Sequence, residues 1–106
     1  MIRRVWRGWT TPENADAYQR ILLDEVIPMI EAKAMPEYRG IEVLREHIGD
    51  EVEFCTIMNF DTLDGVKAFQ GDDYARCHVP AVAQTVLKRW DEFSRHYDVV
   101  AVRETP

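Results

Sequence analysis

The sequence has 106 residues, of which 46% are hydrophobic and 30% charged. This length and balance are typical of one globular domain spanning residues 1–106, and they exclude broad disorder. The net charge of −6 argues against nucleic acids and anionic membranes as partners, because both attract basic surfaces. No apolar run approaches the ~20 residues of a membrane span. The basic residues after Met1 are not followed by the apolar segment of a secretory signal, so we expect a cytoplasmic protein.

The first third of the chain is predicted to form a strand and then a helix. Ile2–Thr10 places bulky side chains alternately on two sides, which is typical of a strand buried on both faces. The segment Thr10 to Glu13 is typical of a helix start, with a hydroxyl cap and a proline near the first helical position. Apolar residues then recur at helical spacing as far as Ile30. Pro28 has no N–H to donate, so we expect a kink or an early end there.

A hairpin is predicted next, from Ile41–Ile48 and Val52–Phe60 joined by a turn at Gly49 and Asp50. Glycine at the first turn position suits a two-residue turn between antiparallel strands. One face of the second hairpin strand is expected to carry Val52, Phe54, Thr56, Met58 and Phe60. Apolar residues on the opposite face indicate that both sides of this strand are covered.

The last part of the chain is predicted to contain two helices and a strand. Thr62 is a typical cap for a short helix that ends at Gly71. Apolar residues from Val79 to Phe93 recur every three or four positions, which predicts a second long helix. Alternation over His96–Arg103 predicts a final strand.

This order of elements predicts an α+β domain with the ferredoxin-like βαββαβ plan. Right-handed crossovers give a four-stranded antiparallel sheet with spatial order 4-1-3-2, and both helical connections lie on one face. The other face still carries large apolar side chains, which would be exposed to water in a monomer. We therefore expect a homodimer in which two copies pack through their open sheet faces with two-fold symmetry.

Several stretches of the sequence resemble the antibiotic biosynthesis monooxygenase family of dimeric α+β barrels. The matching stretches are Trp6–Thr10, Pro12–Glu13, Tyr38–Gly40, Leu44–Arg45, Glu53–Thr56, Phe60–Phe69, Gly71–Tyr74, Val79–Pro80 and His96–Val99. The resemblance implies a ligand cleft between the sheet and the helices of each subunit. It implies cofactor-free oxygenation of aromatic polyketides as one activity, beside heme degradation and members without an assigned reaction.

The heme-degrading branch of that family is matched poorly. Its members use an asparagine in the first strand, a tryptophan near the end of the third strand and a helical histidine. The corresponding positions here hold Trp6, Phe60 and His78. Because only the histidine agrees, heme degradation is disfavoured.

His78 is the first candidate catalytic residue, because an imidazole titrates near neutrality and can take a proton from a phenol or enol. Tyr74 would lie one helical turn earlier and donate a hydrogen bond, and Trp6 with Trp9 would form a stacking wall. The competing interpretation of His78 is a partly exposed histidine at a helix end with no function.

Candidate substrate-binding residues are mostly aromatic, as expected for a flat apolar ligand. They are Trp9, Phe54, Met58, Phe60 and, as polar members, Arg4 and His96. The apolar residues are equally typical of plain core. Arg4 and Arg7 both lie in the first strand, and an arginine in a strand buried on both sides needs a carboxylate partner or an acidic ligand. Exposure at a sheet edge, or pairing with Glu42, Glu46 or Glu53, is the competing interpretation for these two arginines. His96 begins the last predicted strand, which lies beside the first.

No metal site and no cofactor are predicted. The three histidines do not share the spacing of metal ligands, and neither do the two cysteines. Cys55 and Cys77 are interpreted as reduced thiols, with Cys55 a small buried residue within a strand.

Three hypotheses for function remain at this stage. The first is a cofactor-independent monooxygenase that acts with dioxygen on a small aromatic or polyketide-like phenol or enol. The second is a non-catalytic small-molecule-binding or stress-related protein with the same dimeric fold. The third is another enzyme of this fold, such as an isomerase or lyase. Oxygen consumption separates the first hypothesis from the other two.

Overall fold

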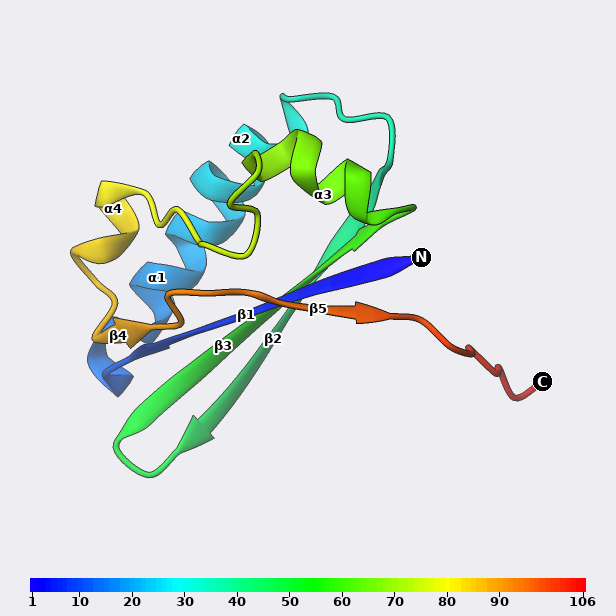
Figure 1. Ribbon diagram of the computed structural model, residues 1–106. Coiled ribbons are helices and arrows are strands. Elements are labelled where there is room, and N and C mark those ends of the chain that lie inside the picture. Colours follow the sequence, from blue (N-terminus) through cyan, green and yellow to red (C-terminus); the bar gives the residue numbers. More distant parts are fainter.

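The computed structural model describes all residues from Met1 to Pro106, and it forms an antiparallel sheet with its helices gathered on one face (Figure 1). The strands are β1 (Ile2–Thr10), β2 (Tyr38–Ile48), β3 (Glu51–Phe60), β4 (Arg89–Trp90) and β5 (Arg95–Asp98). β3 lies between β2 and β1, and both β4 and β5 pair with the other edge of β1. The predicted ferredoxin-like class is confirmed, with the difference that the predicted fourth strand is divided into two short pieces.

The hairpin and its face pattern form as predicted. Gly49 has a φ of 62°, a left-handed conformation that glycine adopts without strain. All of the residues predicted for one face of β3 are buried, and they are Val52, Phe54, Thr56, Met58 and Phe60. This face lies against the helices, whereas the residues between them are only half-buried.

The first helical segment is one irregular run made of η1 (Pro12–Asn14), α1 (Ala15–Ile21), η2 (Leu22–Val26) and α2 (Ile27–Glu31). The Thr11 side chain caps it by accepting a hydrogen bond from the Asn14 N–H at 3.3 Å. The predicted irregularity at Pro28 takes the form of a widened π-helical turn, in which the Ile27 N–H donates to the Leu22 carbonyl. Such a turn relieves the clash between a proline ring and the carbonyl four residues earlier.

The short helix α3 (Leu63–Gln70) is also as predicted. The Thr62 hydroxyl accepts a hydrogen bond from the Gly65 N–H, and Gly71 ends the helix with a φ of 87°.

The prediction of a second long helix from Val79 to Phe93 is wrong. Only α4 (Ala81–Gln84) is helical, and the chain then turns into β4. The Lys88 N–H donates to the Trp9 carbonyl at 2.7 Å, and the Asp91 N–H donates to the Arg7 carbonyl at 2.9 Å. These bonds satisfy backbone carbonyl groups along an edge of β1 that a helix would leave unpaired. Pairing with β1 therefore overrides the helical preference indicated by the spacing of the apolar residues.

The final strand is shorter than predicted and ends at Asp98 rather than Arg103. Its last backbone hydrogen bond runs from the Val99 N–H to the Met1 carbonyl at 3.0 Å. Beyond this point β1 has no residues left to pair with, so the chain leaves the sheet (Figure 1). Val100 is consequently 94% exposed.

Two buried clusters hold the helices against the sheet. The larger contains Ala15, Tyr18, Leu22, Val52, Phe54, Ala83 and Leu87, and the smaller contains Met58, Phe60 and Val66. In the larger cluster the rings of Tyr18 and Phe54 meet edge to face with their centroids 4.9 Å apart. The clusters lie at the two ends of the sheet, which leaves room between them.

The opposite face of the sheet has no helix over it (Figure 1). It carries large exposed apolar side chains, among them Leu44, Ile48 and Tyr97. We refer to this surface of β1, β2, β3 and β5 as the open face.

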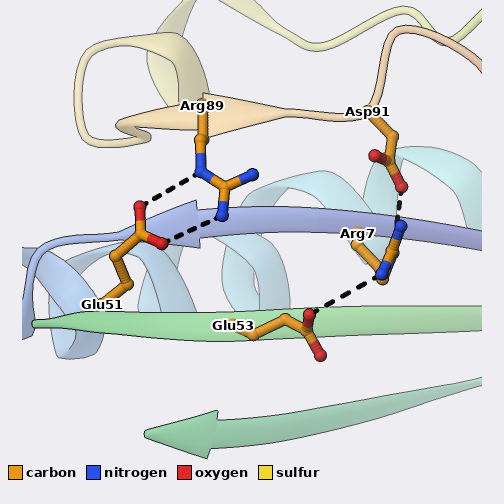
Figure 2. Close-up of polar contacts among 5 residues, drawn as sticks. All are labelled: Arg7, Glu51, Glu53, Arg89 and Asp91. Atoms are coloured by element: carbon orange, nitrogen blue, oxygen red, sulfur yellow. Dashed lines mark hydrogen bonds and ion pairs between the residues drawn. The ribbon is translucent and has the colours of Figure 1, made fainter. Parts of the chain in front are cut away.

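Charged side chains cover one part of the open face. The guanidinium carbons of Arg89 and Arg7 lie 3.8 Å and 5.2 Å from the centre of the Trp9 ring, which is only 7% exposed. Figure 2 shows the ion pairs that hold both arginines, namely Arg7 with Glu53 and Asp91, and Arg89 with Glu51. Trp9 is therefore covered by the side chains of Arg7 and Arg89 rather than by a second layer of secondary structure.

None of the helices is both long and apolar enough to cross a membrane.

The Trp6 ring packs closely against Gly8, two residues further along β1. A Cβ at Gly8 would lie 2.7 Å from the Trp6 ring and 3.1 Å from a Leu87 methyl group. We expect Gly8→Ala to lower the free energy of unfolding by about 1–3 kcal/mol, because these packed groups must move. Urea unfolding measures the loss.

The matched test is the same substitution in a Trp6→Leu background, where the clashing ring is absent. There Gly8→Ala should cost clearly less. An equal cost in both backgrounds would contradict this account of the contact.

Candidate functional site

A half-open cavity of about 90 Å³ lies between the sheet and the helices, in the gap between the two buried clusters. Its floor is formed by Arg4, Trp6, Thr56 and Met58 of the two central strands. These residues share the helix-side face because side chains alternate along each strand and β1 pairs with β3 in register. The first helical segment supplies an apolar wall, mainly through Tyr18, Leu22 and Val26.

The loop between α3 and α4 closes the other side of the cavity. Cys77, His78 and Val79 line it from this loop, and Ser94 lines it from the chain just before β5. The Cys77 N–H donates to the Glu92 carbonyl at 2.9 Å, which ties the loop to the β4–β5 connection. The cavity is therefore apolar along the helices and polar where the loop meets β1.

Arg4 is the most unusual residue of the cavity, because its charged side chain is only 4% exposed. Nη1 donates to the Tyr74 carbonyl and lies 2.9 Å from His96 Nε2. Nη2 lies 3.9 Å from the Cys77 sulfur. Arg4 makes no salt bridge, so the predicted carboxylate partner is wrong for Arg4, whereas it is confirmed for Arg7. Arg7 rather than Arg4 pairs with Glu53, since Arg7 shares the open face with it.

His96 is positioned by the pairing of β5 with β1, which sets it directly opposite Arg4. Burial and then the positive charge of Arg4 lower the pKa of His96 to about 4. The imidazole is therefore neutral near pH 7, and its Nε2 accepts the hydrogen bond from Arg4. The Tyr74 ring meets the His96 ring edge to face, with centroids 5.1 Å apart.

Cys77 and Ser94 form a second polar contact, with Sγ and Oγ 2.8 Å apart. Burial raises the pKa of the Cys77 thiol, although Ser94 and Arg4 oppose the rise. The thiol therefore stays protonated near neutral pH and brings no negative charge to Arg4. Across the whole molecule, no three His, Cys, Asp or Glu side chains gather in an arrangement that could hold a metal ion.

Trp6 lines the cavity as predicted, and one hydrogen bond fixes its ring. The indole N–H donates to the Asp91 carbonyl at 2.9 Å. His78 also lines the cavity, but it is exposed and lies in a loop rather than at the start of a long helix. We therefore place His78 at the open side of the cavity.

Tyr74 does not stand one helical turn before His78, because residues 71–80 form no helix. Its side chain does not line the cavity. Tyr74 instead contributes its backbone carbonyl to Arg4 and its ring edge to His96.

Three predicted binding residues lie away from the cavity, and a fourth, His96, contacts Arg4 but does not line the cavity itself. Trp9 is on the open face, so the expected stacking wall of Trp6 with Trp9 is wrong: an odd spacing along a strand puts the two rings on opposite faces. Phe54 and Phe60 are fully buried in the two core clusters and do not line the cavity. The competing interpretation, that they are core, fits both of them. Met58 does line it.

Sequence reasoning did not single out the roles of Cys77 and Ser94. They come together because the chain pairs at Arg76 and Phe93 outside any regular strand. A pairing of this kind leaves no periodic signal in the sequence. The apolar wall residues could be recognised only as one face of a helix.

Comparison with known proteins identifies the fold. No family model matches the sequence, and no curated protein matches it. A solved structure described as a "putative antibiotic biosynthesis monooxygenase" from Bacillus cereus matches 98% of this chain and 97% of its own, with a TM-score of 0.68 and 8% identity. Another with the same description, from Chloroflexus aurantiacus J-10-fl, matches 97% and 96%, with a TM-score of 0.57 and 18% identity. The fold indicated by the resemblance in sequence is thereby confirmed.

The lowered pKa of His96 makes stability depend on pH. The unfolded imidazole, with its ordinary pKa of 6.5, takes up a proton that the folded state resists until about pH 4. This contribution to stability is complete above the unfolded pKa and is lost as the pH falls toward 4. We expect wild-type protein to lose more unfolding free energy between about pH 7 and about pH 5 than His96→Gln does. Urea unfolding at the two pH values measures this.

His47→Gln is the control, since His47 is exposed at the end of the hairpin. It should keep the wild-type dependence on pH. If His96→Gln followed the wild-type slope, His96 would not be held neutral by its surroundings.

Proposed function

We propose that this protein is a cofactor-independent monooxygenase that oxidises a small phenol or enol with dioxygen in the cytoplasm. The observation that carries the proposal is the half-open cavity between sheet and helices, with the fixed Trp6 ring in its floor and His78 at its open side. The shared fold with two structures described as putative antibiotic biosynthesis monooxygenases supports it. Two free cysteines fit a reducing compartment.

The chemistry asks the protein for a base, a flat binding wall and the exclusion of water. His78 would take the hydroxyl proton of a bound phenol, leaving an electron-rich anion against Trp6. The anion passes one electron to dioxygen, and the two radicals combine at a ring carbon as a peroxide anion. The proton held by His78 then converts this anion to a hydroperoxide and leaves His78 neutral again. Loss of water leaves a quinone, with one oxygen atom in the product and the other in water. The apolar wall keeps bulk water from the reacting centre.

Ligand binding without turnover is the second candidate. It is favoured by the absence of any hydrogen bond from a protein group to the His78 ring, because a catalytic base is ordinarily oriented by a partner. In this case ligands would raise the melting temperature and no oxygen would be consumed.

We expect His78→Ala to lower the rate of quinone formation from a hydroxylated aromatic substrate by about 100-fold or more, because the general base is lost. Oxygen uptake and the absorbance of the quinone measure the rate. His47→Ala is the matched control and should leave the rate unchanged, since His47 is exposed and does not line the cavity. A His78→Ala rate equal to that of wild-type protein would remove His78 from the mechanism.

We also propose that the protein works as a homodimer through its open face. The helices cover only one side of the sheet, and Leu44 and Tyr97 are about half exposed on the other side. Packing two such faces together would bury these side chains on both copies. The charged groups over Trp9 would lie beside this apolar area.

Light scattering should therefore give twice the chain mass of 12.4 kDa at micromolar concentration. Leu44→Lys should shift the protein toward the monomer, because it places a charge within the apolar contact. Leu23→Lys is the control, since Leu23 is equally exposed, 47% against 48%, but lies in the helical layer. A monomer in wild-type protein would contradict the proposal.

A further inference from the structure

We propose that the cavity binds a small organic anion whose negatively charged oxygen atoms are held by the Arg4 guanidinium. This inference rests on the proposed function in one respect, because it concerns the same cavity and names the class of its ligand. It starts from a charge that the protein buries and does not neutralise.

The ten arginines of the molecule differ in their pairing and in their burial. Five of them form salt bridges with carboxylates near the surface, and they are Arg7, Arg39, Arg45, Arg76 and Arg89. Arg4, the buried one, forms none. Surface pairs contribute little, because water already solvates both charges. Arg3, Arg20, Arg95 and Arg103 also form no salt bridge, but none of them is buried. A buried guanidinium without a charged partner is costly, so Arg4 is the arginine that most needs a negative charge.

The groups around Arg4 are neutral acceptors. Nη1 contacts the Tyr74 carbonyl and the imidazole of His96, and Nη2 faces the thiol of Cys77. Burial keeps His96 unprotonated and Cys77 protonated near neutral pH, so neither can serve as a counterion. The positive charge therefore remains for a ligand to balance.

Arg4 also has hydrogen-bond donors to spare. A guanidinium carries five N–H groups, and in Arg4 only those of Nη1 reach an oxygen or nitrogen acceptor. Nε and Nη2 contact no oxygen, and together they form the edge that binds a carboxylate through two parallel bonds. Because Arg4 lines the cavity, an oxyanion of the ligand can complete this set.

The size of the cavity limits the ligand. At about 90 Å³ the half-open cavity is smaller than the ~150 Å³ cavity known to admit benzene, so even a single ring must extend through its open side and a fused polycycle would lie largely outside. A single ring with one acidic substituent fits better, with its acid group at Arg4, its ring near Trp6 and the remainder toward His78. Benzoate-like acids and acidic phenols share this chemistry.

Pairs of ligands that differ in charge but not in shape test the inference. Benzoate and 4-hydroxybenzoate are compared with benzamide and 4-hydroxybenzamide by calorimetry and by the melting temperature. The acids should bind wild-type protein and raise its melting temperature, and the amides should bind about 10-fold or more weakly.

Arg4→Met removes the charge and keeps much of the side-chain volume. The variant should bind the acids about 10- to 100-fold more weakly and the amides unchanged. Arg20→Met is the matched control: Arg20 is exposed and makes no salt bridge, so acid binding should be unchanged. Should Arg4→Met fail to fold, the comparison of acids with amides on wild-type protein decides alone.

Several results would overturn the inference. They are equal binding of acids and amides, undiminished acid binding by Arg4→Met, no binding of any acid, or equal stabilisation by chloride or inorganic phosphate.

Oxygen uptake separates this inference from the proposed function. Charge-selective binding without oxygen uptake would support the anion site and overturn the oxygenase. Oxidation of acidic phenols such as 4-hydroxybenzoate at an equal rate in wild-type protein and Arg4→Met would support the oxygenase and overturn the anion site.

Discussion

Backbone pairing along both edges of β1 determines where the rest of the molecule lies. On one edge β3 pairs with the strand over its whole length, and on the other edge β4 and β5 divide it between them. Pairing with β5 sets His96 opposite Arg4, and the connection from β4 holds the Trp6 indole through the Asp91 carbonyl. Because strand side chains alternate, the same pairing sends Arg4 and Trp6 into the cavity and Arg7 and Trp9 to the open face. The cavity and the open face thus lie on the two sides of the same strand, β1.

Local signals in the sequence were sufficient for the elements from β1 to α3. The Thr11 and Thr62 caps, the turn at Gly49 and the alternation of β3 all depend on neighbouring residues, and all formed as expected. The prediction failed from Val79 to Phe93, where a helical spacing of apolar residues gave way to pairing with a distant strand. A free strand edge is a property of the assembled sheet, so no window of the sequence contains it.

The candidate site was predictable in its components more than in its contacts. Arg4, Trp6, Met58 and His78 could be named because their residue types stand out in strands or beside a helix, and all four line the cavity. Tyr74 proved important through its backbone carbonyl, which side-chain chemistry cannot indicate. Cys77 and Ser94 meet through an irregular pairing of loops. The sequence could not predict that Arg4 lacks a carboxylate partner, because this depends on where the folded chain places every carboxylate.

The two cysteines lie on opposite sides of the sheet, and this gives the protein two built-in reporters. Cys55 is half-buried on the open face beside Arg7, whereas Cys77 faces the cavity. Burial raises the pKa of both thiols, so both react slowly with alkylating reagents near neutral pH. The labelling rate of Cys55 would report whether a second subunit covers the open face. The labelling rate of Cys77 would report whether a ligand fills the cavity. One mass spectrum could therefore read assembly and occupancy separately.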